Sequence, residues 1–128
     1  MPEKKIFISD LREAEEFTAG DGCTLRELLH PGKQPLALGY SLAHAAVEPG
    51  QTTAPHRLKE SSEVYFILEG EGLMHIDDEV APVRPGQAVY IPPGARQFIS
   101  NLGDTDLVFI CLVDPGWRVE DEEVFASG

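Results

Sequence analysis

The stretch GQTTAPHRLKESSEVYFILEG, residues 50–70, is the most informative part of the chain. His56 and Leu58 are two residues apart, so on an extended segment their side chains point to the same side. Glu63 begins the apolar run EVYFIL, and burying its carboxylate costs free energy unless a cation or hydrogen-bond donors meet it. The stretch therefore predicts a strand, a turn and a second strand, with a polar site where the two strands face each other.

Short apolar runs separated by turn residues continue on both sides of this stretch. They are LGYSLAHAAV, LMHI, AVYIP, QFIS and DLVFICLV, and the turns include EPGQ, LEGEG, RPGQ, PPGA and NLGDTD. Runs of this length at nearly regular spacing, with no long helical period between them, predict an all-β antiparallel sandwich or barrel. At the N-terminal end we expect a short helix over residues 10–17, capped by Asp10, and then a strand through TLRELL.

The bulk composition narrows the possible partners. The chain has 128 residues, 42% of them hydrophobic and 25% charged, which is typical of one soluble globular domain. Its formal charge of −12 makes nucleic acid and anionic membranes poor partners, because both would be repelled. No apolar stretch has the length of a signal peptide or a membrane span, so we expect a cytoplasmic protein that binds a small-molecule ligand.

Two blocks of the chain resemble the two sequence motifs of the cupin superfamily. In the first block, Gly50, His56, Glu63 and Gly70 are at the motif spacing. The second block, GQAVYIPPGARQFISN over residues 86–101, also keeps its spacing. The resemblance implies a jelly-roll barrel, or double-stranded β-helix, formed by a single domain over residues 1–128. Its core would span about 36–114, with an N-terminal extension over 1–35 and an acidic C-terminal tail over 115–128. The resemblance also implies a homodimer.

The same resemblance implies a divalent metal held by three histidines and one glutamate. Only His56 and Glu63 are kept, because Leu58 and Gln97 stand where the motif has histidines. We predict that His56, Glu63 and the amide oxygen of Gln97 hold Mn, Fe, Zn or Ni, less tightly than three histidines would. His44 is the reserve ligand. The alternative is a metal-free pocket in which His56 hydrogen-bonds Glu63 or Gln97.

These residues support two classes of function. One is an enzyme that acts on a small oxygenated metabolite. With a metal bound it would be a dioxygenase or an isomerase. Without a metal it would be an epimerase, in which Glu63, with a raised pKa, pairs with His56 as acid and base. Tyr65 shares the face of Glu63 and is expected to act there as pocket wall and hydroxyl donor. The other class is a non-catalytic ligand-binding barrel. A route from solvent to His56 and Glu63 would favour the enzyme. If the side chains of Leu58 and Phe98 block that route, the site is a structural remnant without catalytic function.

Three further segments carry predictions. Cys111 lies within LVFICLV, which reads as a fully buried strand, so we expect Cys23 and Cys111 to be structural thiols. The acidic run 120–123 is expected to be solvated. Trp117 and Phe125 are expensive to leave in water, so the C-terminal tail should pack on the barrel or on a neighbouring subunit. Alternation in SLAHAAV turns His44 away from the cavity, toward a possible subunit interface.

Overall fold

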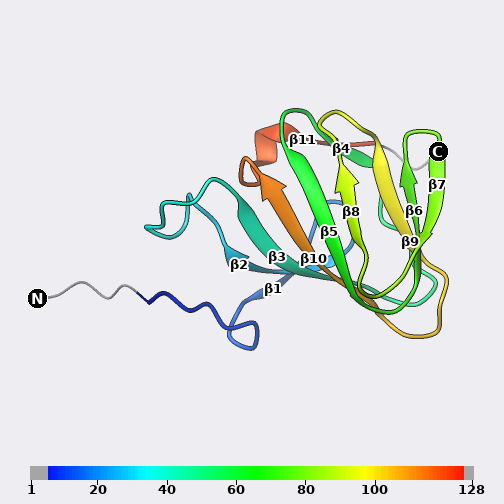
Figure 1. The fold of residues 1–128 in the computed structure, drawn as a ribbon, viewed down its shortest axis with the longest axis horizontal. Coiled ribbons are helices and arrows are strands. Elements are labelled where there is room, and N and C mark those ends of the chain that lie inside the picture. The colour runs from blue at the N-terminus through cyan, green and yellow to red at the C-terminus, as the bar shows by residue number, and fades with distance from the viewer. Residues whose placement is uncertain (1–5, 126–128) are drawn as a thin grey trace, which may run out of the picture.

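A computed structural model describes residues 6–125 and contains two antiparallel sheets packed face to face, as a jelly roll (Figure 1). The six-stranded sheet has the order β1 (Glu16–Thr18), β2 (Thr24–Leu29), β3 (Ser41–Val47), β10 (Leu107–Asp114), β5 (Ser62–Glu69) and β8 (Ala88–Ile91). The five-stranded sheet has the order β11 (Glu122–Val124), β4 (His56–Leu58), β9 (Gln97–Asn101), β6 (Gly72–Ile76) and β7 (Glu79–Val83). The predicted all-β class is confirmed.

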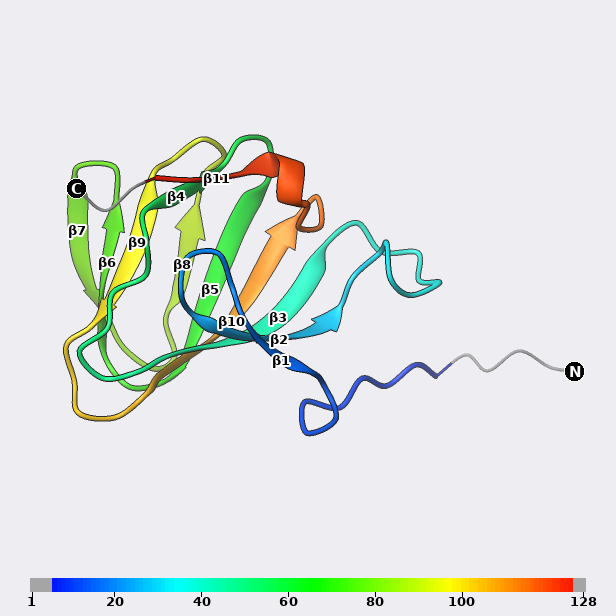
Figure 2. The ribbon, with the colours of Figure 1, turned by 180° about the vertical axis from the view of Figure 1, so that it is seen from behind.

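The core fills the space between the sheets with side chains from alternate strand positions. Ile67, Ile91, Ile99, Leu107 and Phe109 are almost completely buried. This layer excludes water from one end of the sandwich, so free space remains toward the other end, where β1 and β2 extend the larger sheet (Figure 2).

A glycine fixes the end of β5, the strand that begins with Glu63. Gly70 has φ 81°, a conformation that L side chains rarely adopt. A Cβ atom there would also lie 2.5 Å from the carbonyl oxygen of Asp106, which leads into β10. The motif glycine is therefore needed for the close approach of β5 to β10, the two strands that carry much of the candidate site.

The helix expected over residues 10–17 is wrong. The backbone N–H groups of Glu13 and Ala14 bond to the carbonyl oxygen of Asp10, which makes a turn, and the chain becomes β1 at Glu16. Pairing of β1 with β2 supplies ladder bonds that a helix of two turns cannot match. In the part of the chain that the structure describes, no helix is long and apolar enough to cross a membrane.

The acidic run of the tail is not a solvated end, which is a second correction. Asp121 is only 3% exposed, and its carboxylate accepts bonds from the backbone N–H groups of Glu60 and Ser61. β11 follows directly and pairs with β4, the strand that begins with His56. The prediction that the tail packs on the barrel is confirmed for this segment, and the buried carboxylate is stabilised by the turn it caps.

Candidate active site

A cavity of about 320 Å³ lies between the sheets on the side of β1 and β2, a volume typical of small-molecule sites. Its walls are mainly apolar and its polar groups gather in one region. The polar lining includes Asp21, His56, Glu63, Tyr65, Cys111 and Glu122, and the apolar lining includes Phe17, Leu25, Ala43, Ala45, Phe109, Val113 and Trp117. Neither Leu58 nor Phe98 lines the cavity, so neither plugs the route to His56 and Glu63.

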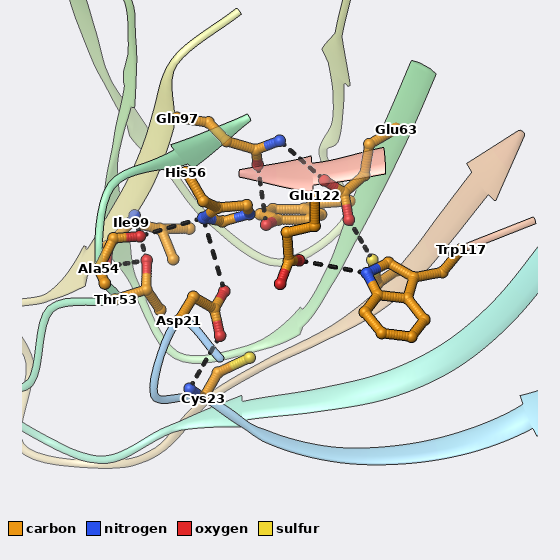
Figure 3. A network of polar contacts seen from close by, with 12 residues as sticks. Asp21, Cys23, Thr53, Ala54, His56, Glu63, Gln97, Ile99, Trp117 and Glu122 are labelled. Carbon is orange, nitrogen blue, oxygen red and sulfur yellow. Dashed lines mark hydrogen bonds and ion pairs between the residues drawn. The ribbon is translucent and has the colours of Figure 1, made fainter. Parts of the chain in front are cut away.

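Glu63 is the buried acid at the centre of the polar cluster. The Gln97 side-chain amide donates to Oε1 of Glu63 at 2.8 Å, and the Cys111 thiol donates to Oε2 at 2.6 Å (Figure 3). Desolvation by burial raises the pKa of Glu63, and the opposing effects of Cys111, His56 and Gln97 are smaller. Glu63 is therefore disposed to hold a proton, as the sequence predicted for a carboxyl group in this position.

Tyr65 and Gln97 extend this cluster toward the core. Tyr65 lines the cavity, packs its ring 4.3 Å from that of Phe109 and donates its hydroxyl to Oε1 of Gln97 at 3.0 Å. Burial raises the pKa of Tyr65 well above its ordinary value, so the hydroxyl is a neutral donor. Gln97 is 1% exposed and lies behind the cavity wall, with both ends of its amide engaged. The predicted role of Tyr65 as wall and hydroxyl donor agrees with this geometry.

His56 is held by the backbone rather than by Glu63 or Gln97. Its Nδ1 lies 3.0 Å from the carbonyl oxygen of Ala54, which can only accept, so Nδ1 carries the proton. In the neutral ring, Nε2 is then left with a free lone pair on a side chain that lines the cavity. A carboxylate oxygen of Asp21 lies 3.8 Å from Nδ1 (Figure 3).

The sequence reasoning missed Asp21 and misjudged Cys111. Asp21 is 8% exposed in the turn between β1 and β2, where its side chain accepts the backbone N–H of Cys23 at 3.1 Å. A local bond of this kind is the usual role of an aspartate in a turn. Only the tertiary fold brings the Asp21 side chain close to His56. Cys111 lines the cavity and donates to Glu63, and its alternation with Phe109 could have shown this.

The donor set does not fit a metal centre formed by His56, Glu63 and Gln97. Only His56 and Glu63 of this set are strong metal ligands, and both oxygens of Glu63 already accept hydrogen bonds, from Gln97 and Cys111. The amide oxygen of Gln97 already accepts from Tyr65, and Leu58 has no donor atom. The reserve ligand His44 pairs across the sheet with Ile110 and is not among the cavity-lining residues, since Ala43 and Ala45 take the inward positions.

Comparison with known proteins agrees with the fold. An uncharacterized protein of Methanocaldococcus jannaschii is 38% identical over 94% of this chain and 95% of its own. An oxalate-binding protein of Thermotoga maritima is 31% identical over 56% of this chain and 59% of its own length. The structure of Pac13, a nucleoside dehydratase of Streptomyces, superimposes with a TM-score of 0.77 at 19% identity, covering 94% of this chain and 92% of that chain, a likeness of fold alone. The Cupin domain family model matches residues 43–113, and the chain therefore belongs to the cupin domain family.

Proposed function

We propose that this protein is an enzyme that moves protons on a small, uncharged oxygenated metabolite, as in an isomerisation or epimerisation, with Glu63 and His56 as its acid and base. The observation that carries the proposal is the pairing of these two groups in one largely apolar cavity. The carboxyl group of Glu63 has a raised pKa, and the imidazole of His56 has its free nitrogen at Nε2. Proton-transfer catalysis requires an acid and a base within reach of one ligand, and these two groups line the same cavity.

In the proposed reaction, Nε2 of His56 takes a proton from the ligand, next to a carbonyl or hydroxyl carbon. The resulting imidazolium is stabilised by the Asp21 carboxylate near Nδ1. Glu63 donates its proton to the ligand oxygen or carbon that gains electron density. The side-chain amide of Gln97, which donates to Oε1, can then stabilise the carboxylate of Glu63. Transfer of the His56 proton back through solvent or product restores both groups. Tyr65 keeps the Gln97 amide oriented by its hydroxyl bond.

The charge around the cavity supports an uncharged ligand. Asp21, Glu63 and Glu122 all line it, and its single lining ammonium, Lys33, already pairs with Glu27 at 2.6 Å. A phosphate or carboxylate ligand would meet these carboxylates at short range, with no free cation among the described lining residues. The apolar walls, including Trp117 at the cavity rim, favour a ligand with an apolar or aromatic portion.

The test is deuterium incorporation from heavy water into a panel of neutral aldoses, ketoses and nucleosides, each compared with its phosphate ester. We expect exchange into an uncharged member, unchanged by a chelator. The rate should fall by about 10²–10⁴-fold in His56→Ala and in Glu63→Gln, because each removes one partner in the transfer. Exchange that survives both substitutions would contradict the proposal.

Metal analysis tests the alternative chemistry on the same residues. The ligand set His56, Glu63 and Gln97 remains a prediction from the family resemblance. Near-stoichiometric Mn, Fe, Zn or Ni in protein purified without chelator, lost in His56→Ala and Glu63→Ala, would replace the acid–base proposal by a metal-dependent one. We expect metal below stoichiometry, and a melting temperature that the chelator leaves unchanged.

A second candidate is a non-catalytic binding barrel, and one observation favours it. Among the described residues, no fully buried polar side-chain atom lacks a hydrogen-bond partner, so the polar cluster apart from Nε2 of His56 is satisfied without a ligand. Calorimetry with the same panel separates the two. A neutral ligand that binds wild type without deuterium exchange, and binds His56→Ala equally well, would support the binding barrel.

A further inference from the structure

Two side chains of the C-terminal tail, Trp117 and Glu122, lie at the rim of the cavity, and we call them the rim pair. Both line the cavity, and the indole Nε1 of Trp117 donates to Oε2 of Glu122 at 3.2 Å (Figure 3). Both lie outside the two motif blocks, which end at Asn101. The acid–base chemistry proposed above uses neither side chain, so their place at the cavity requires a separate explanation.

Attachment of the tail to the barrel does not explain the rim pair, because other contacts already hold the tail. The backbone N–H of Trp117 donates to Oγ of Ser41 at 2.9 Å, and its carbonyl oxygen accepts from Nε2 of His30 at 2.7 Å. The carboxylate of Asp121 caps the turn before β5, and β11 pairs with β4. None of these contacts uses the indole ring or the carboxylate of Glu122, so both groups remain available to a ligand.

The turn between β1 and β2 leaves room for the carboxylate of Glu122. A Cβ atom on Gly20 would lie 3.2 Å from Oε1 of Glu122, closer than an ordinary van der Waals contact. Gly20 is not among the glycines with positive φ, so it supplies space rather than an unusual backbone conformation. A carboxylate has about four lone-pair sites for hydrogen bonds, and within residues 6–125 the side chain that donates to this one is Trp117. Glu122 therefore has acceptor capacity left at the cavity rim.

The chemistry of the rim pair defines the part of a ligand that it can contact. A carboxylate only accepts, so the ligand must present donors to Glu122, and on an uncharged oxygenated metabolite these are hydroxyl groups. Two adjacent hydroxyls can donate to the two oxygens of one carboxylate, and hydrogen bonds to a charged acceptor are stronger than neutral ones. Beside this acceptor, the Trp117 indole offers a flat apolar surface against which the C–H groups of a sugar ring can pack.

We propose that the rim pair is a specificity subsite for the vicinal diol of a neutral sugar ring, with Glu122 accepting from two adjacent hydroxyls and Trp117 packing on the ring. This inference rests on the proposed function, which places the reacting carbon at His56 and Glu63. These two residues are 3% and 6% exposed, whereas Trp117 is 37% exposed, so the diol is at the outer end of the ligand. In a hexose, C1 and C2 then face the acid–base pair, and the hydroxyls at C3 and C4 face Glu122.

The test combines a change in the protein with removal of one ligand hydroxyl. Isothermal titration calorimetry of the full chain uses D-glucose, D-mannose and D-galactose, each beside its 3-deoxy and 4-deoxy analogues. We expect at least one hexose to bind, and loss of either hydroxyl to weaken its binding by about 10-fold or more. In Glu122→Ala this preference should fall to within about 2-fold, because the hexose loses affinity and the analogue does not. A structural defect would weaken the hexose and its analogue equally.

Glu123→Ala is the matched control, since Glu123 is the next residue of β11 and bonds to Arg57 instead. It should keep the preference for the hexose. Trp117→Ala should weaken the hexose and both analogues alike, because packing on the ring does not depend on one hydroxyl, and Trp117→Phe should restore part of the affinity. Far-UV circular dichroism establishes that each variant is folded, and Glu122→Gln, which should reduce the preference, keeps the test valid if Glu122→Ala does not fold.

Three results would overturn the subsite: no binding of any of the three hexoses, a preference that survives in Glu122→Ala, or a preference that Glu123→Ala abolishes equally. The proposed function fails in a different way. A hexose preference that depends on Glu122, without deuterium exchange into the hexose, would support the subsite and contradict the acid–base chemistry. Deuterium exchange into a hexose that binds no better than its deoxy analogues would support the chemistry and contradict the subsite.

Discussion

The inner face of the six-stranded sheet carries a polar cluster among its core residues, and the outer face carries large apolar side chains that contact water. The side chains of Glu63, Tyr65 and Cys111 point inward and bond to buried groups, whereas Phe66 and Ile110, on the same strands, point outward. An antiparallel sheet ordinarily has apolar residues inside and polar residues in water. Buried polar groups on the inner face cost stability, which is typical of residues kept for function rather than for folding. The inner face lines the cavity, and the outer face leaves the ring of Phe66 42% exposed.

Of the substitutions considered, replacing His56 should change a measured quantity, the deuterium-exchange rate, the most. We expect His56→Ala to lower the deuterium-exchange rate by about 10²–10⁴-fold, because the ring supplies the base. His75 is the matched control, since its ring stacks on Phe98 outside the cavity at 4.0 Å. Equal loss of exchange in His75→Ala would show that the effect is not specific to the inner face.

Truncating one phenylalanine on each face compares a buried ring with an exposed one. Phe109 is 2% exposed and lies against Tyr65, so Phe109→Ala should cost about 3–5 kcal/mol of unfolding free energy. Phe66 is 42% exposed, so Phe66→Ala should cost less, because less apolar surface returns to water. Chemical denaturation measures both free energies. An equal loss of stability in the two variants would contradict the comparison.

Asp121 does not line the cavity, and its burial is expected to serve stability alone. Asp121→Ala should cost about 1–3 kcal/mol, because the backbone N–H groups of Glu60 and Ser61 lose their acceptor. Glu120→Ala, at the exposed neighbouring position, should change the unfolding free energy little. Thermal unfolding of the pair, read beside deuterium exchange, should show lost stability with exchange retained. A deuterium-exchange rate that falls in Asp121→Ala in proportion to the lost stability would contradict a purely structural role for Asp121.

The smallest expected effect is a pH dependence that originates at Glu63. Its pKa is raised in the folded protein, so its contribution to stability is fully present below the ordinary value of 4.5 and is lost as pH rises toward the folded value. Wild type should therefore lose stability relative to Glu63→Gln above pH 4.5, by at most about 1.4 kcal/mol per pH unit. Melting curves across pH measure the difference. A difference that grows in favour of wild type would mean that the carboxylate form is the stabilised one.

The strands of the barrel could be predicted because their periodicity and turn residues agree. The motif spacing also located His56 and Glu63 at one cavity, and alternation along the strand placed Tyr65 on the same face as Glu63. β7 was missed because Glu79–Val83 is exposed over most of its length and contains Pro82, so it lacks the alternation of a half-buried strand. The segment 10–17 has good helix formers, and only its pairing partner β2 makes it a turn and a strand.

The missed parts of the site share one physical cause. Asp21 and Glu122 come from a turn and from the tail, and their approach to His56 depends on where β1 and β11 pair. No local pattern encodes such long-range placement. The hydrogen bond between His56 and Ala54 likewise depends on backbone geometry that the sequence pattern does not show. That bond occupies Nδ1 and leaves Nε2 as the nitrogen that can accept a proton.

The register of β5 against β10 has an evolutionary consequence. Tyr65 is across from Cys111, and Phe66 is across from Ile110. Because side chains alternate, inserting or deleting one residue in β5 would send the carboxyl group of Glu63 to the outer face of the sheet and the ring of Phe66 into the cavity. The polar cluster of the cavity would be lost in one event. Lineages descending from this protein should therefore vary the length of its loops freely, while β5 and β10 change only by substitution.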